Sequence, residues 1–154
     1  MNLPAQLPRP DHIWSIVDCF AFFDMADDAM RRPYNAANHF EVAERIVELS
    51  QLFPSAGDVQ AAAVYYANEA FRVAVHDYAQ ELKDRAEQKD IYKPLVAPMV
   101  LSAYLKSRTA EYLHMKEKAE RCSAGLVHSL DALRSVLSNL KEHARLATFG
   151  GGGA

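Results

Sequence analysis

Glycine is scarce in this chain of 154 residues. Four of its six glycines are consecutive, at positions 150–153, so only Gly57 and Gly125 lie elsewhere. A sheet of several strands needs many turns, and glycine is one of the residues that turns use most. The scarcity therefore argues against a β-rich fold and favours an all-α fold, a helical bundle of about four helices.

Long apolar runs and paired cysteines are missing as well. The most apolar stretch, residues 19–23, is far shorter than the ~20 residues that a membrane-spanning helix needs. The first residues, with prolines at 4, 8 and 10, lack the basic region of a signal peptide. The two cysteines, Cys19 and Cys122, fall at apolar helix positions, which suits small core residues in a reducing compartment. We therefore expect a cytoplasmic protein with no membrane partner.

Catalytic and metal-binding signatures are few. The sequence has no phosphate-binding loop, no dinucleotide-binding glycine motif, no nucleophile elbow and no Cys-x-x-Cys pair. One Glu-x-x-His unit, Glu111 with His114, is present, but a di-iron site in a bundle needs two such units and further carboxylates. We predict no catalytic residue, no metal site and no cofactor.

Two pairs of carboxylates leave an enzymatic alternative open. Glu41 with Glu44, and Glu81 with Asp84, have the i, i+3 spacing that can hold Mg²⁺ from a helix. The pairs resemble the signature of the all-helical nucleotide pyrophosphohydrolases of the MazG type. That resemblance implies magnesium-dependent hydrolysis of nucleoside triphosphates, although solvated helices also carry such pairs by chance.

The pattern predicts one all-helical domain over residues 1–149, with an irregular proline-rich segment at 1–10 and a flexible tail at 150–154. The first helix is expected from His12 to about Arg31, capped by Asp11. The second begins near Asn38, which forms a capping box with Glu41, and a break follows at 54–57. The third runs from Val59 to about Lys89, capped by Asp58, and the last from Pro98 to Ala147.

Apolar residues at helical spacing mark the expected core face of each helix. On the first helix these residues are Ile13, Ile16, Val17, Phe20 and Phe23. On the second they are Phe40, Ala43, Ile46, Val47 and Phe53. On the third they are Val59, Ala62, Ala63, Tyr66, Ala70, Val73 and Leu82.

The last expected helix carries an apolar seam at heptad spacing from Leu101 to Ala147, which is typical of a coiled coil. Fifty helical residues would span ~75 Å, longer than a small domain. The helix therefore either breaks, with Gly125 as its weakest point, or projects into an oligomer.

Charge is unevenly divided along the chain. Residues 1–80 hold 5 basic and 11 acidic residues, a net charge of −6, and residues 81–154 hold 12 and 9, a net charge of +3. Basic residues with interleaved tyrosines suit single-stranded nucleic acid, where cations meet phosphates and bases stack on rings. The candidate nucleic-acid-binding residues, all on the last helix, are Lys106, Arg108, Lys116, Lys118, Arg121, Arg134, Lys141 and Arg145. A bundle whose charges merely segregate is the simpler alternative.

Three short motifs follow one another along this helix. They are Leu101-Ser102-Ala103, Cys122-Ser123, and Leu130-Asp131-Ala132-Leu133-Arg134-Ser135. This part of the chain, about 45 of the 154 residues, resembles the C-terminal half of the UvsY family of phage recombination mediators. The resemblance implies a ring-like homo-oligomer, in the cytoplasm of a bacterial host cell, that binds single-stranded DNA and helps a RecA-type recombinase displace single-strand-binding protein. It also implies an assembly face at Leu126, Leu133, Val136 and Leu140.

We therefore expect a non-enzymatic, oligomeric single-stranded-DNA-binding recombination mediator. Two alternatives stay open. One is a helical protein-binding adaptor, such as a phage anti-defence or scaffold protein, that works through its acidic N-terminal half. The other is the pyrophosphohydrolase.

Overall fold

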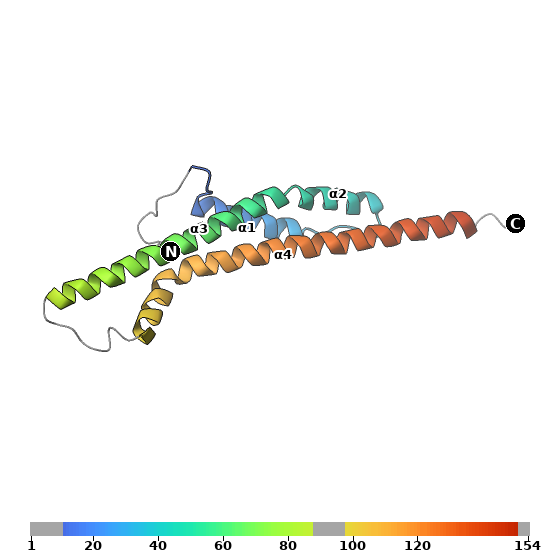
Figure 1. Ribbon diagram of the computed structural model, residues 1–154. Helices are drawn as coiled ribbons and strands as arrows, with labels where there is room; N and C mark the ends of the chain where they lie inside the picture. Colours follow the sequence, from blue (N-terminus) through green and yellow to red (C-terminus); the bar gives the residue numbers. More distant parts are fainter. Residues whose placement is uncertain (1–10, 88–97, 151–154) are drawn as a thin grey trace.

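The computed structural model describes residues 11–87 and 98–150, and within these ranges it contains helices and no strand. The helices are α1 (Ile16–Arg31), α2 (His39–Ser50), α3 (Phe53–Glu87) and α4 (Pro98–Gly150). Figure 1 shows α3 and α4 side by side and antiparallel, with α1 beside the first half of α3 and α2 along the C-terminal half of α4. The predicted all-α fold with a long last helix is confirmed. The expected irregular segment 1–10 and residues 151–154 of the expected tail lie outside the described residues.

Helix α1 begins at Ile16 and is capped by Ser15, whose hydroxyl accepts a hydrogen bond from the Asp18 amide at 3.1 Å. The predicted start at His12 with Asp11 as N-cap is therefore wrong. Serine caps a helix well because its side chain satisfies an amide that has no partner within the helix. The preceding segment is held in place by the Tyr66 hydroxyl, which donates to the Trp14 carbonyl at 3.1 Å.

Helix α2 begins as predicted. The Asn38 side chain accepts a hydrogen bond from the Phe40 amide at 3.1 Å and donates to the Glu41 carboxylate at 2.9 Å. The predicted break at 54–57 is wrong, because α3 already begins at Phe53 and the interruption falls at residues 51–52. Pro54 occupies the first turn of α3, where a helix loses nothing by the missing amide hydrogen.

Helix α4 is continuous through Gly125 over 53 residues, a length of about 80 Å. Gly125 marks a close approach between helices: an added Cβ would lie 3.1 Å from the Met30 sulfur of α1. The glycine thus allows α1 to pack tightly against α4. Figure 1 also shows the first turns of α4 tilted relative to the rest of the helix.

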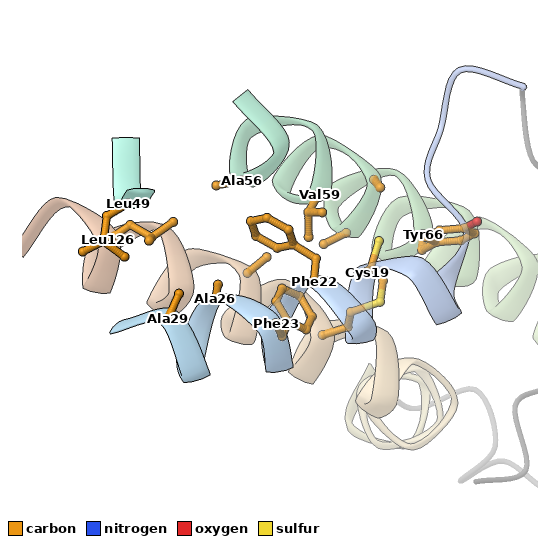
Figure 2. Packing of buried hydrophobic residues seen from close by; sticks show 14 of the residues in the cluster. Cys19, Phe22, Phe23, Ala26, Ala29, Leu49, Ala56, Val59, Tyr66 and Leu126 are labelled. Atoms are coloured by element: carbon orange, nitrogen blue, oxygen red, sulfur yellow. The ribbon is translucent and has the colours of Figure 1, made fainter. Parts of the chain in front are cut away.

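The core forms where α1, α2 and α3 meet the apolar seam of α4. Alanines such as Ala62 and Ala63 dominate the buried face of α3, and they let the neighbouring helices approach closely. In Figure 2, Phe22 of α1 points toward Val59 of α3, and Leu49 of α2 lies beside Leu126 of α4. The predicted core face of α3 is confirmed for Val59, Ala62, Ala63, Tyr66 and Ala70, while Val73 and Leu82 are half-buried.

The predicted core faces of α1 and α2 are partly wrong. Val17 is 74% exposed, whereas Phe22, which is not among the predicted core residues, is buried. On α2, Phe40 and Val47 are exposed, and the buried residues are Val42, Arg45 and Leu49. Both helices have apolar residues on two sides, and the fold buries only one of them.

Candidate functional site

The residues predicted as an assembly face belong largely to the core of the chain itself. Leu126 and Leu133 are buried by the chain's own helices, and Val136 and Leu140 pack partly against the same core. Helix α4 thus has the predicted apolar seam, and α1, α2 and α3 cover it. The assignment of Leu126 and Leu133 to a subunit interface is therefore corrected, because neither side chain is accessible to a neighbour.

At least four of the eight predicted nucleic-acid-binding residues form ion pairs within the described part of the chain. Lys116 pairs with Glu120 at 4.0 Å, Arg121 with Glu117 at 3.4 Å, and Arg134 with Asp131 at 3.3 Å, all along α4. Lys118 instead reaches α1, with its ammonium 3.6 Å from Asp24 and above the rings of Phe20 and Phe23. These contacts reduce the positive charge that α4 presents.

The eight residues do not form one continuous stripe. Lys116, Arg134, Lys141 and Arg145 are 18, 7 and 4 residues apart, which places them on one side of a helix with about 3.6 residues per turn. Lys118 and Arg121 fall on the other side of the buried seam by the same geometry. The cationic surface of α4 is therefore divided.

The tyrosines expected to stack on bases are engaged elsewhere. Tyr104 packs against Tyr78 of α3 with ring centroids 5.1 Å apart, and the Arg108 guanidinium lies 5.4 Å from the Tyr104 centroid. Tyr112 is buried, and this burial, aided by the Glu111 carboxylate, raises the pKa of its phenol. Tyr112 is therefore inaccessible to a base, and Tyr104 already has two partners within the chain.

The carboxylate pairs of the enzymatic alternative do not meet. Glu41 accepts a hydrogen bond from the Asn35 amide at 2.9 Å at the start of α2, and Glu81 pairs with Arg85 at 2.9 Å near the far end of α3. In Figure 1, α2 and α3 follow one another along one line, and the start of α2 lies far from the C-terminal end of α3. Across residues 11–87 and 98–150, no three His, Cys, Asp or Glu side chains gather as metal ligands.

The structure also reveals an apolar groove that the sequence reasoning missed. It lies between α3 and the start of α4 and has a volume of about 420 Å³. The residues that line the groove include Ala67, Phe71, Leu101, Leu105, Lys106 and Leu113. Phe71 is 52% exposed and Leu113 is 43% exposed, so two large apolar side chains face solvent.

Exposed apolar residues extend the groove along α3. Val64 and Val75 lie 7 residues before and 4 residues after Phe71, on the same side of the helix, and both are exposed. This spacing was the sequence signal that could have revealed the surface. We call Val64, Phe71, Val75 and the residues that line the groove the groove surface.

Comparison of the chain with profiles of known protein families, with curated protein sequences and with solved structures finds no match. None of the helices in the described part of the chain is both long enough and apolar enough to cross a membrane.

Proposed function

We propose that this chain is a helical protein-binding adaptor whose working site is the groove surface. One observation carries the proposal: Phe71 stands half-exposed in a concave, apolar site between two helices. Large aromatic residues in such sites supply much of the binding energy of protein interfaces. Exposed apolar side chains gathered around a groove mark interaction sites on protein surfaces.

The form of the site favours an amphipathic helix as its ligand. Val64 and Val75 are 11 residues apart, about 16 Å along α3, which matches about three turns of a bound helix. Lys106 lines the groove and makes no ion pair with a described residue. An acidic side chain on the bound helix would meet this ammonium. The working site is thus the α3–α4 groove rather than the acidic N-terminal helices.

Selection from a displayed library of helical peptides tests the proposal. We expect peptides with apolar residues at i, i+4 and i+7 to bind the folded chain, and Phe71→Glu to abolish that binding. Val17→Glu is the matched control, because Val17 is an exposed valine on α1, outside the groove. Selected peptides that bind Phe71→Glu and the unchanged chain equally would overturn the proposal.

The single-stranded-DNA-binding mediator remains the second candidate. Its support is the flank of α4 that carries Lys116, Arg134, Lys141 and Arg145, over a length of about 44 Å. A recombinase, or a single-strand-binding protein, follows as partner only from the family resemblance. The pairing of half of the candidate cations weakens this candidate relative to the first.

Fluorescence polarisation with a labelled strand of about 30 nucleotides, at low salt and at about 200 mM salt, tests the second candidate. Salt-sensitive binding that Arg134→Glu with Lys141→Glu weakens would support it. Arg72→Glu is the control, because Arg72 is an exposed, ion-paired arginine on α3. Absence of binding at low salt would remove this candidate.

A further inference from the structure

We propose that a pocket between the start of α1 and the middle of α4 binds a small aromatic molecule that carries an ammonium group. The pocket has a volume of about 240 Å³. The residues that line it include Ile16, Phe20, Ala110, Glu111, Tyr112 and Met115. It lies between α1 and α4, whereas the groove lies between α3 and α4, so this proposal does not rest on the proposed function.

The walls and the size of the pocket suit an aromatic ring. Ile16 and Phe20 of α1 and Met115 of α4 are large apolar side chains, and a methionine sulfur packs favourably against aromatic rings. An apolar cavity of about 150 Å³ is large enough for a benzene-sized ligand. The volume of about 240 Å³ therefore leaves room for a ring with a short side chain.

Tyr112 gives the pocket a hydrogen-bonding group that the chain itself does not use. The residue is 3% exposed, and among residues 11–87 and 98–150 its hydroxyl has no hydrogen-bond partner. Tyr66, which is equally buried, instead donates to the Trp14 carbonyl. The Tyr112 oxygen is not fully enclosed by protein atoms, so a molecule in the pocket can reach it. A ligand that supplies the missing hydrogen bond is favoured, because a buried hydroxyl without a partner costs free energy.

Glu111 supplies the negative charge that selects a cation. Its side chain is exposed at the pocket and forms no ion pair with a described residue. Its charge acts on the pocket wall, since it contributes to the raised pKa of Tyr112. Lys118, the cation above the Phe20 ring, already lies 3.6 Å from Asp24. An ammonium group on the ligand would therefore find its counter-charge at Glu111.

Isothermal titration calorimetry of the full chain with tryptamine tests the proposal. Tryptamine combines an indole ring, a ring N–H donor and an ammonium group. His114 also lines the pocket, so the titration is run at pH 8, where histidine is normally uncharged and alkylamines are protonated. We expect saturable binding with a Kd below about 1 mM, as is usual for a ligand of this size in a fitting pocket.

Two conservative variants separate the polar contacts. Glu111→Gln should weaken tryptamine about fivefold and leave the affinity for 3-ethylindole, which lacks the ammonium group, unchanged. Tyr112→Phe should weaken tryptamine about two- to tenfold and leave 2-phenylethylamine, which lacks the ring N–H, unchanged. Glu142→Gln is the matched control, because Glu142 is an exposed glutamate near the other end of α4.

Methyl NMR spectra show where tryptamine binds. Met115 lines the pocket, whereas Met30 lies beside Gly125 and Met99 lies in the first turn of α4. Among these three methionines, only the Met115 methyl signal should shift during the titration. The shift also shows that the chain is folded when it binds.

Filling the pocket from its exposed edge gives the last test. Ala110→Leu places a larger side chain in the lining and should weaken binding at least about tenfold, whereas Ala132→Leu, at an exposed position elsewhere on α4, should not. No saturable binding up to about 5 mM tryptamine, an unmoved Met115 signal, or unchanged affinity in Glu111→Gln would overturn the proposal.

Discussion

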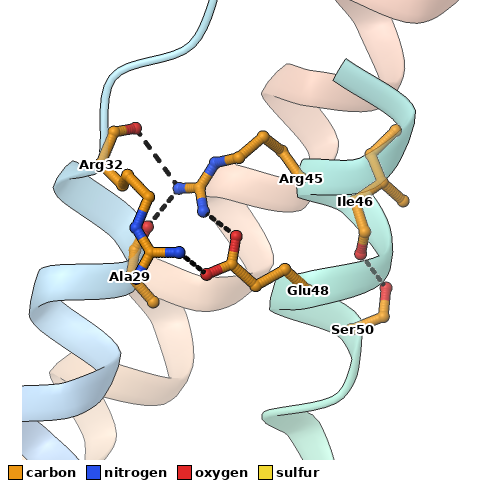
Figure 3. A network of polar contacts seen from close by, with 6 residues as sticks. All are labelled: Ala29, Arg32, Arg45, Ile46, Glu48 and Ser50. Carbon is orange, nitrogen blue, oxygen red and sulfur yellow. Dashed lines mark hydrogen bonds and ion pairs between the residues drawn. The ribbon is translucent and has the colours of Figure 1, made fainter. Parts of the chain in front are cut away.

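Replacing Arg45 by methionine tests the polar contact that joins α1 to α2. The Arg45 side chain is only 8% exposed, and its guanidinium donates hydrogen bonds to the Ala29 carbonyl, to the Arg32 carbonyl at 3.4 Å and to Glu48 (Figure 3). The two carbonyls lie at the end of α1, where no following turn supplies an amide partner. A cation at this position also interacts favourably with the helix dipole.

The expected loss in the free energy of unfolding follows from which contacts of Arg45 methionine keeps and which it removes. It keeps much of the apolar stem but removes three charge-assisted hydrogen bonds, each worth about 1.5–3 kcal/mol. Two effects offset this loss. Glu48 keeps its ion pair with Arg32 at 2.6 Å, and the buried Arg45 Nε, which has no hydrogen-bond partner among residues 11–87 and 98–150, disappears. Since burying a cation also costs desolvation, we expect a net loss of about 2–3 kcal/mol in the free energy of unfolding.

Urea denaturation followed by circular dichroism measures this loss. The midpoint should fall without a change in the slope, because the surface exposed on unfolding is unchanged. Arg72→Met is the matched control, since Arg72 forms an exposed pair with Glu69 and should lose less than about 1 kcal/mol. If Arg45→Met came within about 0.5 kcal/mol of the unchanged chain, apolar packing alone would hold α1 and α2 together, and the reasoning would fail.

Three further predictions concern the core. Leu126→Ala should lower the free energy of unfolding by about 2–5 kcal/mol in urea denaturation, because Leu126 is fully buried, and a loss below about 1 kcal/mol would contradict its central place. Gly125→Ala should raise the free energy of unfolding by up to about 1 kcal/mol, because the flexible Met30 side chain can move aside. Gly125→Leu should instead lower the melting temperature. Stabilisation by both substitutions would show that α1 and α4 do not approach closely here. Burial raises the pKa of the Cys19 thiol from 9.0 to about 11, so the unfolded chain loses this proton first and stability should fall as the pH rises from 9.0 to 11. Cys19→Ala should flatten that fall in denaturation curves, and an unchanged pH profile would contradict the assignment.

The sequence predicted best what depends on strong periodicity or a local capping pair. The seam of α4 is regular over many turns, so the all-α fold and the long last helix followed from it. The seam did not show whether Leu126 would face a second subunit or, as it does, the chain's own helices. Asn38 with Glu41 predicted the start of α2, because capping involves only neighbouring residues. Pro54 misled the prediction, since the same residue that ends a helix also fits its first turn.

The buried sides of α1 and α2 could not be predicted from periodicity. On α2, the stripe of Phe40 and Val47 is as regular as the buried stripe of Val42 and Leu49. Arg45 lies within the buried stripe and makes it look polar. Only the contact of Arg45 with the end of α1 shows which side faces inward, and that contact joins residues far apart in the sequence.

The candidate site illustrates a different limit. Three of the ion pairs that reduce the charge of α4, such as Arg121 with Glu117, have i, i+3 or i, i+4 spacing and were visible in the sequence. The pair between Lys118 and Asp24 joins two helices and required the fold. Residue type alone therefore overestimated the cationic surface.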